Sequence, residues 1–171
     1  IPPFMQGITQ NILRRKKAAP HIGTSCLFLV DDSGSMAGSF DRFAWQAAAM
    51  LSIACERAKV RSSIVRVSDE ALMTKTFIQA LASVARELSL GLGGGTQAAP
   101  AIKVAHNHMA METNPRRVVF FLCDGATECV NRQVRELRAD GIEFYPILFG
   151  EYAVRQASPG GCYDFPGAIV I

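Results

Sequence analysis

The sequence predicts an open α/β domain: a mainly parallel β-sheet with one antiparallel edge strand and helices on both faces. Two continuous apolar runs, residues 25–30 and 118–123, are each followed by an acidic residue and a turn, as buried parallel strands are. Segments with helical spacing alternate with these runs. The 171 residues suit one domain, and 49% hydrophobic against 19% charged residues excludes a disordered chain.

Residues 1–23 are expected to form a basic arm or linker, and residues 24–171 the domain. Arg14, Arg15, Lys16 and Lys17 have no acidic neighbour, whereas the rest of the chain carries 14 basic and 15 acidic side chains. A short helix over residues 8–17 is the most structure we expect there. The chain begins at Ile1 without a leader, so we expect a piece of a longer protein. The arm is interpreted as a solvated linker, with nucleic acid or a membrane surface as the alternative contact.

The first half of the domain is expected to contain three strands and two helices. Residues 25–30 form the first strand, and residues 64–67 and 72–77 an antiparallel pair around a turn at residues 68–70. Residues 42–59 form a long helix. The apolar positions expected to pack it on the sheet are Phe43, Ala47, Met50, Leu51, Ala54 and Ala58. A second helix is expected from Ile78 to Leu88, ending at Gly91.

The second half continues the alternation. Pro100 lies in the first turn of a helix that ends before Asn114. The apolar face of that helix is Ala98, Ile102, Ala105 and Met109. Strands are expected at residues 118–123 and 144–149, with an edge strand at residues 168–171. A helix should run from Thr127 or Glu128 to Ala139, and no helical period is found in residues 152–167.

Polar side chains gather where the predicted strands end. Asp31, Ser33 and Ser35 alternate after the first strand, Thr96 lies in a glycine-rich loop, and Asp124 follows the strand at residues 118–123. Ligands of open α/β sheets bind beyond the carboxyl ends of the strands. Five oxygen donors from three loops suit Mg²⁺ or Mn²⁺ rather than zinc. With only two carboxylates, such a cation stays electrophilic and can take an outside carboxylate.

The Asp-x-Ser-x-Ser pattern has a simpler interpretation, a turn and a helix N-cap. Thr96 and Asp124 at matching loop positions favour the metal site over this alternative.

These motifs resemble those of von Willebrand factor type A (VWA) domains. Asp31-x-Ser33-x-Ser35 is similar to the family's metal-ion-dependent adhesion site (MIDAS), residues 94–96 to its threonine loop and residues 121–125 to its aspartate loop. The resemblance covers about residues 24–150. It implies that Ser33, Ser35 and Thr96 coordinate through hydroxyls, that Asp31 and Asp124 hold the ion directly or through water, and that a partner's Asp or Glu completes the octahedron.

The resemblance also implies how such a domain is used. The family usually ends in a C-terminal helix whose displacement switches affinity, and residues 152–167 give no sign of it. Five cysteines without a CxxC pair are interpreted as free, buried thiols in a reducing compartment. The cysteines and the missing leader favour the intracellular branch, so a cytoplasmic scaffold beside an AAA+ ATPase or a chelatase-type complex is expected.

Enzymatic functions fit the sequence less well. A haloacid-dehalogenase phosphatase, the main Mg²⁺-dependent alternative, needs a second carboxylate where Ser33 stands, and neither a nucleophile elbow nor a phosphate loop occurs. We therefore expect a protein-binding domain rather than an enzyme. His106 and His108 are interpreted as surface residues, Cys123 as a buried thiol, and Trp45 as a core residue or an interface anchor. A non-metal interaction through the basic arm stays open.

Overall fold

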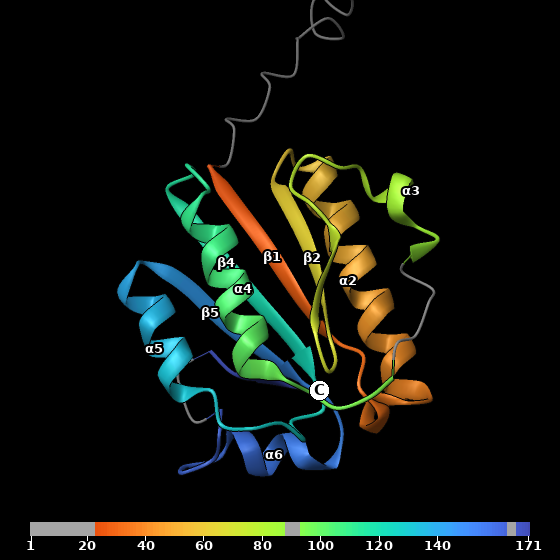
Figure 1. Ribbon diagram of the computed structural model, residues 1–171, viewed down its shortest axis with the longest axis vertical. Coiled ribbons are helices and arrows are strands. Elements are labelled where there is room, and N and C mark those ends of the chain that lie inside the picture. The colour runs from red at the N-terminus through yellow and green to blue at the C-terminus, as the bar shows by residue number, and fades with distance from the viewer. Residues whose placement is uncertain (1–22, 88–92, 164–166) are drawn as a thin grey trace, which may run out of the picture.

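The computed structural model describes residues 23–87, 93–163 and 167–171. Its centre is a six-stranded sheet in the order β3-β2-β1-β4-β5-β6. All neighbouring strands are parallel except β2 and β3, which pair antiparallel at one edge. The predicted α/β fold with one antiparallel edge strand is therefore confirmed (Figure 1).

The strands lie close to their predicted places. They are β1 (Thr24–Asp31), β2 (Arg61–Val67), β3 (Ala71–Lys75), β4 (Arg116–Cys123), β5 (Ile142–Leu148) and β6 (Ile169–Val170). Every residue of β1 is buried, because the strand has a neighbour on each side and helices on both faces. The predicted helix over residues 8–17 lies outside the described residues.

The helices connect the strands. They are the 3-10 turn η1 (Gly34–Met36), α2 (Ser39–Arg57), α3 (Leu81–Val84), α4 (Ala98–Ala110), α5 (Asn131–Ala139) and α6 (Glu151–Ala157). Three predictions need correction. The helix expected from Ile78 is a single turn, α3, while Leu88 and Gly91 lie outside the described residues. The helix expected from Thr127 or Glu128 begins at Asn131, and α6 occupies a segment for which no helix was expected.

The late start of α5 has a structural cause. Glu128 turns back toward α4, where its carboxylate accepts a hydrogen bond from the backbone N–H of Ala99 at 3.0 Å. The N–H groups of a first helical turn have no partner within the helix, so Glu128 caps α4 instead of extending α5. α6 begins after Gly150, whose φ of 84° favours glycine.

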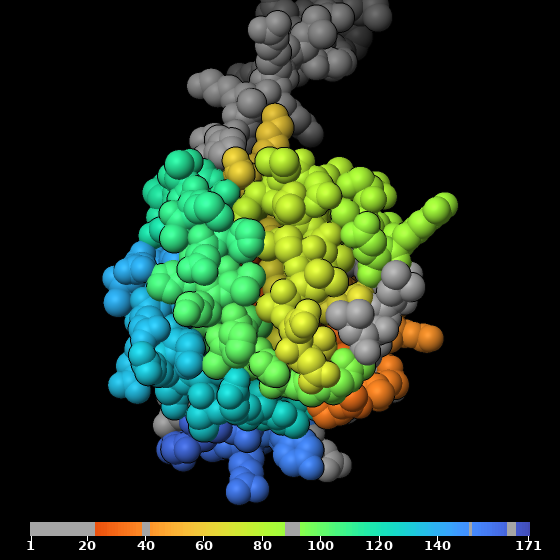
Figure 2. Space-filling model, in the orientation of Figure 1, coloured from red at the N-terminus to blue at the C-terminus, as the bar shows by residue number. Residues whose placement is uncertain are grey.

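Two cores flank the sheet. On one face α4 and α5 pack over Leu27, Leu29 and Phe121; on the other, α2 and α3 cover Phe28 and Val30. The surface of α4 (green) and α5 (cyan) faces the viewer in Figure 2, where only a small part of the orange segment is visible. Among the described residues, no helix has the length and apolarity needed to cross a membrane.

α4 packs as predicted, but α2 does not. Ala98, Ile102, Ala105 and Met109 are all buried beneath α4. On α2 the buried side chains are Ala44, Ala48 and Ser52, whereas Phe43, Met50, Leu51 and Ala54 of the predicted face are exposed. The predicted packing face of α2 is therefore wrong. Bulky Phe28, Val30 and Met36 lie in the same core, which leaves room only for small side chains on α2.

Candidate metal centre

The three loops with the predicted ligands meet at one edge of the sheet. Asp31 is the last residue of β1 and Asp124 follows β4; the two strands are parallel neighbours, with Val30 opposite Leu122. Thr96 precedes α4. In Figure 1 the arrow of β4 points to this edge, near α6. The parallel topology thus brings Thr96 within hydrogen-bond distance of Asp31, 65 positions earlier in the chain.

The first loop folds around the Asp31 carboxylate. Asp31 Oδ1 accepts a hydrogen bond from the backbone N–H of Ser33 at 3.0 Å, and the hydroxyls of Ser33 and Ser35 lie 3.0 Å apart. Asp31 and Ser33 are buried, while Ser35 is exposed. Met36, fully buried in the α2 core, anchors the far end of the turn. This loop therefore presents one carboxylate and two hydroxyls together.

The glycine-rich loop adds the third hydroxyl. Thr96 Oγ1 donates to Asp31 Oδ1 at 3.3 Å. The loop is held to the first one by a hydrogen bond from Gly34 N–H to the carbonyl of Gly94 at 2.9 Å. The structure thus connects Asp31, Ser33, Ser35 and Thr96 directly.

A residue that the sequence analysis missed fixes the glycine-rich loop from the other side. Asp69, in the turn between β2 and β3, accepts a hydrogen bond from the N–H of Gly95 at 2.8 Å. Gly94 has a φ of +97°, and a Cβ on it would clash with Asp69 Oδ2. Only glycine suits that backbone and that close approach. The Ser68-Asp69-Glu70 turn was recognised in the sequence, but its distant contact with residues 94–95 has no local signal.

Asp124 belongs with the other candidate ligands because it directly follows β4, the neighbour of β1, and because its negative charge acts on Asp31. Its Oδ1 accepts a hydrogen bond from the N–H of Ala126 at 2.8 Å, and its side chain is buried. The next residues are tied to the C-terminal part of the chain: the hydroxyls of Thr127 and Tyr163 are 2.5 Å apart, and Cys129 forms a disulfide with Cys162. The Asp124 loop is therefore braced by two contacts.

This disulfide corrects the prediction that all five cysteines are free thiols. Cys129 and Cys162 are 33 residues apart in sequence, with Cα atoms separated by 4.7 Å. Cys26, Cys55 and Cys123 are free. Cys123 is fully buried as expected, and burial raises the pKa of its thiol. The sequence alone does not predict that Cys129 pairs with Cys162, because this disulfide depends on how α6 turns the chain back toward β4.

The electrostatics of the edge favour a bound cation. Burial raises the pKa of Asp31 to about 6; the negative charge of Asp124 acts in the same direction, and hydrogen bonds from Ser33 and Thr96 oppose it. Asp31 Oδ2 is buried without a hydrogen-bond partner among the described residues. A buried unpaired carboxylate oxygen costs free energy, which a cation at that oxygen would offset.

The donor set is consistent with Mg²⁺ or Mn²⁺. The donors are two carboxylates and three hydroxyls, all hard oxygen ligands. Within the described ranges, no group of three or more His, Cys, Asp or Glu side chains is placed to hold a metal ion. The candidate ligands at this edge are thus a hydroxyl-rich donor set.

The neighbouring acidic residue, Asp32, has a different role. Its Oδ2 lies 3.4 Å from Arg66 Nε, and both side chains are buried. The Arg66 guanidinium is 4.7 Å from the ring centre of Trp45, whose indole N–H donates to Asp32 Oδ1 at 3.4 Å. Trp45 was predicted to be either a core residue or an interface anchor. This contact gives its indole N–H a structural role within the domain. Asp32 is therefore paired with the positive charge of Arg66 and is not grouped with the candidate ligands.

Comparison with protein families gives one match that covers the whole candidate site. The model of the von Willebrand factor type A domain matches residues 26–126, more than half of the chain, including all five candidate ligands. The chain belongs to the VWA domain family. VWA domains are protein-interaction modules and are often metal-dependent. A comparison with curated proteins finds no significant sequence match.

Solved structures agree on the VWA fold. The SpRpn10 VWA domain is 12% identical with a TM-score of 0.66, and the match covers 86% of this chain and 87% of that one. BatB from Bacteroides thetaiotaomicron is 16% identical with a TM-score of 0.63, covering 74% and 67%. Proximal thread matrix protein 1 from the mussel byssus, in a form with a zinc-occupied MIDAS motif, is 15% identical with a TM-score of 0.59, covering 78% and 37%. Such identities establish the fold alone.

Proposed function

We propose that this VWA domain binds a partner protein through a divalent cation, Mg²⁺ or Mn²⁺, held at a complete MIDAS by Asp31, Ser33, Ser35, Thr96 and Asp124. The observation that carries the proposal is the buried Asp31 Oδ2, which lacks a hydrogen-bond partner among the described residues beside a cluster of hydroxyls. When bound, the cation supplies an open coordination position for an Asp or Glu carboxylate of the partner.

The chain's own residues set the charge of the site. Asp31 and Asp124 at most balance a divalent charge, and Ser33, Ser35 and Thr96 contribute neutral oxygens. The positive charge of Arg66 is engaged by Asp32, so it does not compete with the ion. This balance favours an acidic ligand from outside over a further carboxylate from within the domain.

The role proposed for the domain is that of a scaffold and not of an enzyme. His106, interpreted from sequence as a surface residue, lies on α4 in the groove between α4 and α5, with its Nε2 at 2.7 Å from Asp140 Oδ2, and not in the loops that carry the candidate ligands. The hydrolase alternative is tested with p-nitrophenyl phosphate and Mg²⁺. Turnover abolished by Ser33→Ala would overturn the scaffold role.

An AAA+ ATPase or chelatase-type complex in the cytoplasm is the partner class that we propose from the family resemblance. The Cys129–Cys162 disulfide removes the cysteine argument for a reducing compartment. Mass spectrometry of protein alkylated directly in cell extract measures the oxidation state of this pair. A pair that is reduced in the cell and forms the disulfide only after extraction would support the cytoplasmic setting, and a pair already oxidised in the cell would contradict it.

Removing a metal-facing carboxylate should abolish cation binding. We expect the wild type to bind Mg²⁺ and Mn²⁺ at millimolar or lower concentration in calorimetry, and Asp31→Ala and Asp124→Ala to show no binding. Asp140→Ala, an exposed aspartate beside His106, is the matched control and should bind normally. Because Asp31 and Asp124 lie at strand ends, the circular dichroism spectra should not change. Binding that survives Asp31→Ala would contradict the site.

Asp69 should act as a positioning residue for Thr96. Asp69→Ala removes the acceptor for Gly95 N–H and should weaken Mg²⁺ binding about tenfold, the lower end of what outer contacts to metal ligands contribute. Asp69→Asn keeps an acceptor oxygen and should restore most of the affinity. Equal losses for both variants would indicate that the charge of Asp69, and not its hydrogen bond, is what matters.

Partner binding should depend on the cation. Proteins retained by the immobilised chain in Mg²⁺ should be lost in EDTA and should not bind Asp31→Ala. Thr96→Ala should weaken retention while changing the free energy of unfolding by less than about 1 kcal/mol, because Thr96 lies in a loop. Proteins that stay bound in EDTA use a different surface.

A further inference from the structure

The outward face of α2 is unusually apolar for a helix that covers a sheet. Phe43 is 57% exposed, Met50 71%, Leu51 37% and Ile53 40%. Single exposed apolar side chains are common on protein surfaces, but a contiguous group on one helix is not. We call the exposed residues Phe43, Met50, Leu51, Ile53 and Ala54, together with the half-buried Ala47, the α2 stripe.

The stripe has the spacing of a helix-packing seam. Phe43, Ala47, Met50 and Ala54 follow one another at intervals of four, three and four residues, so they lie along one line of the helix surface. At 1.5 Å per residue, this line is about 16 Å long, or three helical turns. A second α-helix is the element that such a seam accommodates.

The apolar surface continues into a groove between α2 and α3. The groove has a volume of about 490 Å³. Its apolar lining residues are Trp45, Ala49, Ile53, Leu81, Ala82 and Ala85. Ile53 belongs to both the stripe and the groove, which therefore form one surface.

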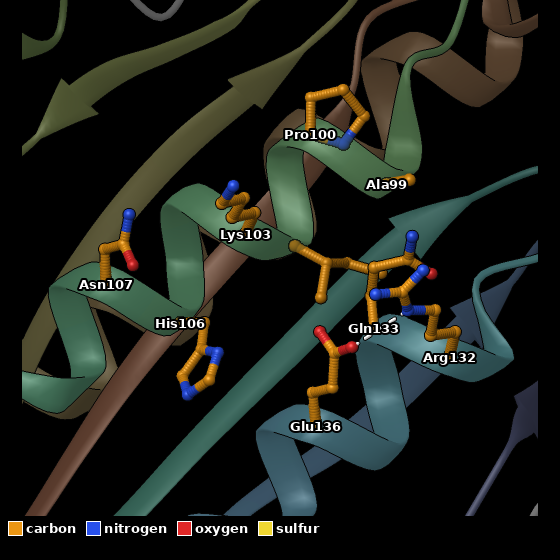
Figure 3. A pocket seen from close by; sticks show the side chains of 9 residues that line it. Ala99, Pro100, Lys103, His106, Asn107, Arg132, Gln133 and Glu136 are labelled. Atoms are coloured by element: carbon orange, nitrogen blue, oxygen red, sulfur yellow. Dashed lines mark hydrogen bonds and ion pairs between the residues drawn. The ribbon is translucent and has the colours of Figure 1, made fainter.

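The other covering helices differ. The groove between α4 and α5 is lined by Lys103 and His106 of α4 and by Arg132 and Glu136 of α5, and the last two are paired at 2.9 Å (Figure 3). Lys103, Asn107 and Arg135 are exposed on these two helices. Their outward faces are polar, as expected of a solvated surface, so the α2 stripe is not a general property of this chain.

The charges around the stripe select its occupant. Arg42 lies at one end, and Arg57 and Lys59 lie at the other; all three are exposed. Among the side chains that the structure describes around this surface, the acidic one is Glu56, which lines the groove; it already accepts a hydrogen bond from Leu81 N–H at 2.7 Å and lies 3.8 Å from Lys75 Nζ. The stripe is thus framed by positive charge, which favours an acidic ligand.

The same charges disfavour two other occupants of this surface: a second copy of this chain, and residues 1–22 of the chain itself. In an antiparallel pairing of two α2 helices centred on Met50, Arg42 of one copy would lie near Arg57 of the other, and a parallel pairing would place each arginine against itself. Residues 1–22 carry Arg14, Arg15, Lys16 and Lys17 and no acidic residue. Either arrangement brings like charges together, which is unfavourable.

We propose that the α2 stripe and the adjoining groove bind an acidic amphipathic helix of another protein. The interaction uses no metal, so it is a second surface, independent of the MIDAS at the sheet edge. Apolar side chains of the bound helix pack on Phe43, Met50 and Ile53, and its flanking carboxylates face Arg42 and Arg57.

Two synthetic 18-residue peptides test this proposal. Both carry leucine at the four-three-four spacing of the stripe; one has glutamate at the flanking positions and the other has lysine. In fluorescence anisotropy with the full chain, in EDTA so that the MIDAS cannot contribute, the glutamate peptide should bind at least tenfold more tightly than the lysine peptide. Met50→Asp should weaken its binding at least tenfold, and Arg42→Glu with Arg57→Glu should reverse the preference.

The matched control is Val154→Asp. Val154 is 65% exposed on α6, so this variant makes the same kind of change outside the stripe and should bind the glutamate peptide like the wild type. Equal binding of the two peptides, or binding unaffected by Met50→Asp, would overturn the proposal. So would a wild-type dimer in sedimentation that Met50→Asp dissociates, or a glutamate peptide that binds only after residues 1–22 are removed. Because EDTA is present throughout, none of these outcomes bears on the metal site.

Discussion

The helices on the two faces of the sheet use the same apolar periodicity in opposite ways. On α4 the periodic positions face the sheet, and Met109 is fully buried. On α2 most of the periodic positions face away, and Met50 is 71% exposed while Ala44 and Ala48 make the contact with the sheet. Periodicity therefore identifies the face of a helix that prefers to leave water, but not what that face packs against.

The sheet explains why the two faces differ. The core between α2 and the sheet contains Phe28, whose ring stacks on that of Phe120 with the ring centres 5.6 Å apart. Phe120 in turn stacks on Tyr145, with the ring centres 5.8 Å apart. This aromatic row takes up the space that larger side chains on α2 would need. Small residues allow α2 to approach, as close packing of an interior requires.

A matched pair of methionine substitutions tests the comparison most strongly. Met109→Ala should lower the free energy of unfolding by about 2–5 kcal/mol, because it leaves a cavity beneath α4. Met50→Ala should change it by no more than about 0.5 kcal/mol. Urea titrations followed by circular dichroism measure both. A loss above about 2 kcal/mol for Met50→Ala would mean that the stripe is covered within the folded chain.

The disulfide is the second difference between the two faces. Cys129 and Cys162 join segments on the α4 and α5 side, whereas Cys26 and Cys55 on the α2 side are free. A cross-link between residues 33 positions apart stabilises by about 4 kcal/mol in the chain-entropy model. The double variant Cys129→Ser with Cys162→Ser should be less stable by that amount and should bind Mg²⁺ more weakly, because the Asp124 loop loses one of its braces.

Cys55→Ser is the control for the disulfide, since that thiol is free on the α2 side. It should leave Mg²⁺ binding unchanged. If the double variant binds Mg²⁺ as tightly as the wild type, the Thr127–Tyr163 hydrogen bond alone holds the loop.

The fold and the candidate ligands were accessible from sequence because their signals are local. A continuous apolar run before Asp31 or Asp124 identifies a buried strand, and the parallel topology then places both carboxylates at one edge. The contacts that were missed join distant segments: Asp69 with Gly95, Glu128 with Ala99, and Cys129 with Cys162. None of these pairs leaves a periodic pattern, because each depends on how two loops meet after the strands have assembled.

The smallest expected effect concerns a buried charge on the α2 side. Lys75, the last residue of β3, is 1% exposed, and its ammonium group donates to the Ser62 carbonyl at 2.6 Å and to the Ser62 hydroxyl at 3.2 Å. Burial lowers the pKa of Lys75 below its ordinary value of 10.5, and the negative charge of Glu56, 3.8 Å away, offsets part of this shift. Burial thus disfavours the charged form of Lys75, and Glu56 favours it.

The sign of the resulting pH dependence follows from proton binding. Between the folded-state pKa of Lys75 and 10.5, the unfolded chain binds more protons than the folded one, so stability rises with pH in that range. Below the folded-state pKa the penalty is fully present. The stability of the wild type relative to Lys75→Met should thus increase as the pH is raised from 7 toward 10, measured by urea titration at each pH. Lys59→Met, a change at an exposed lysine, should show no such trend, and a relative stability that falls with pH would contradict the assignment of burial as the dominant effect on Lys75.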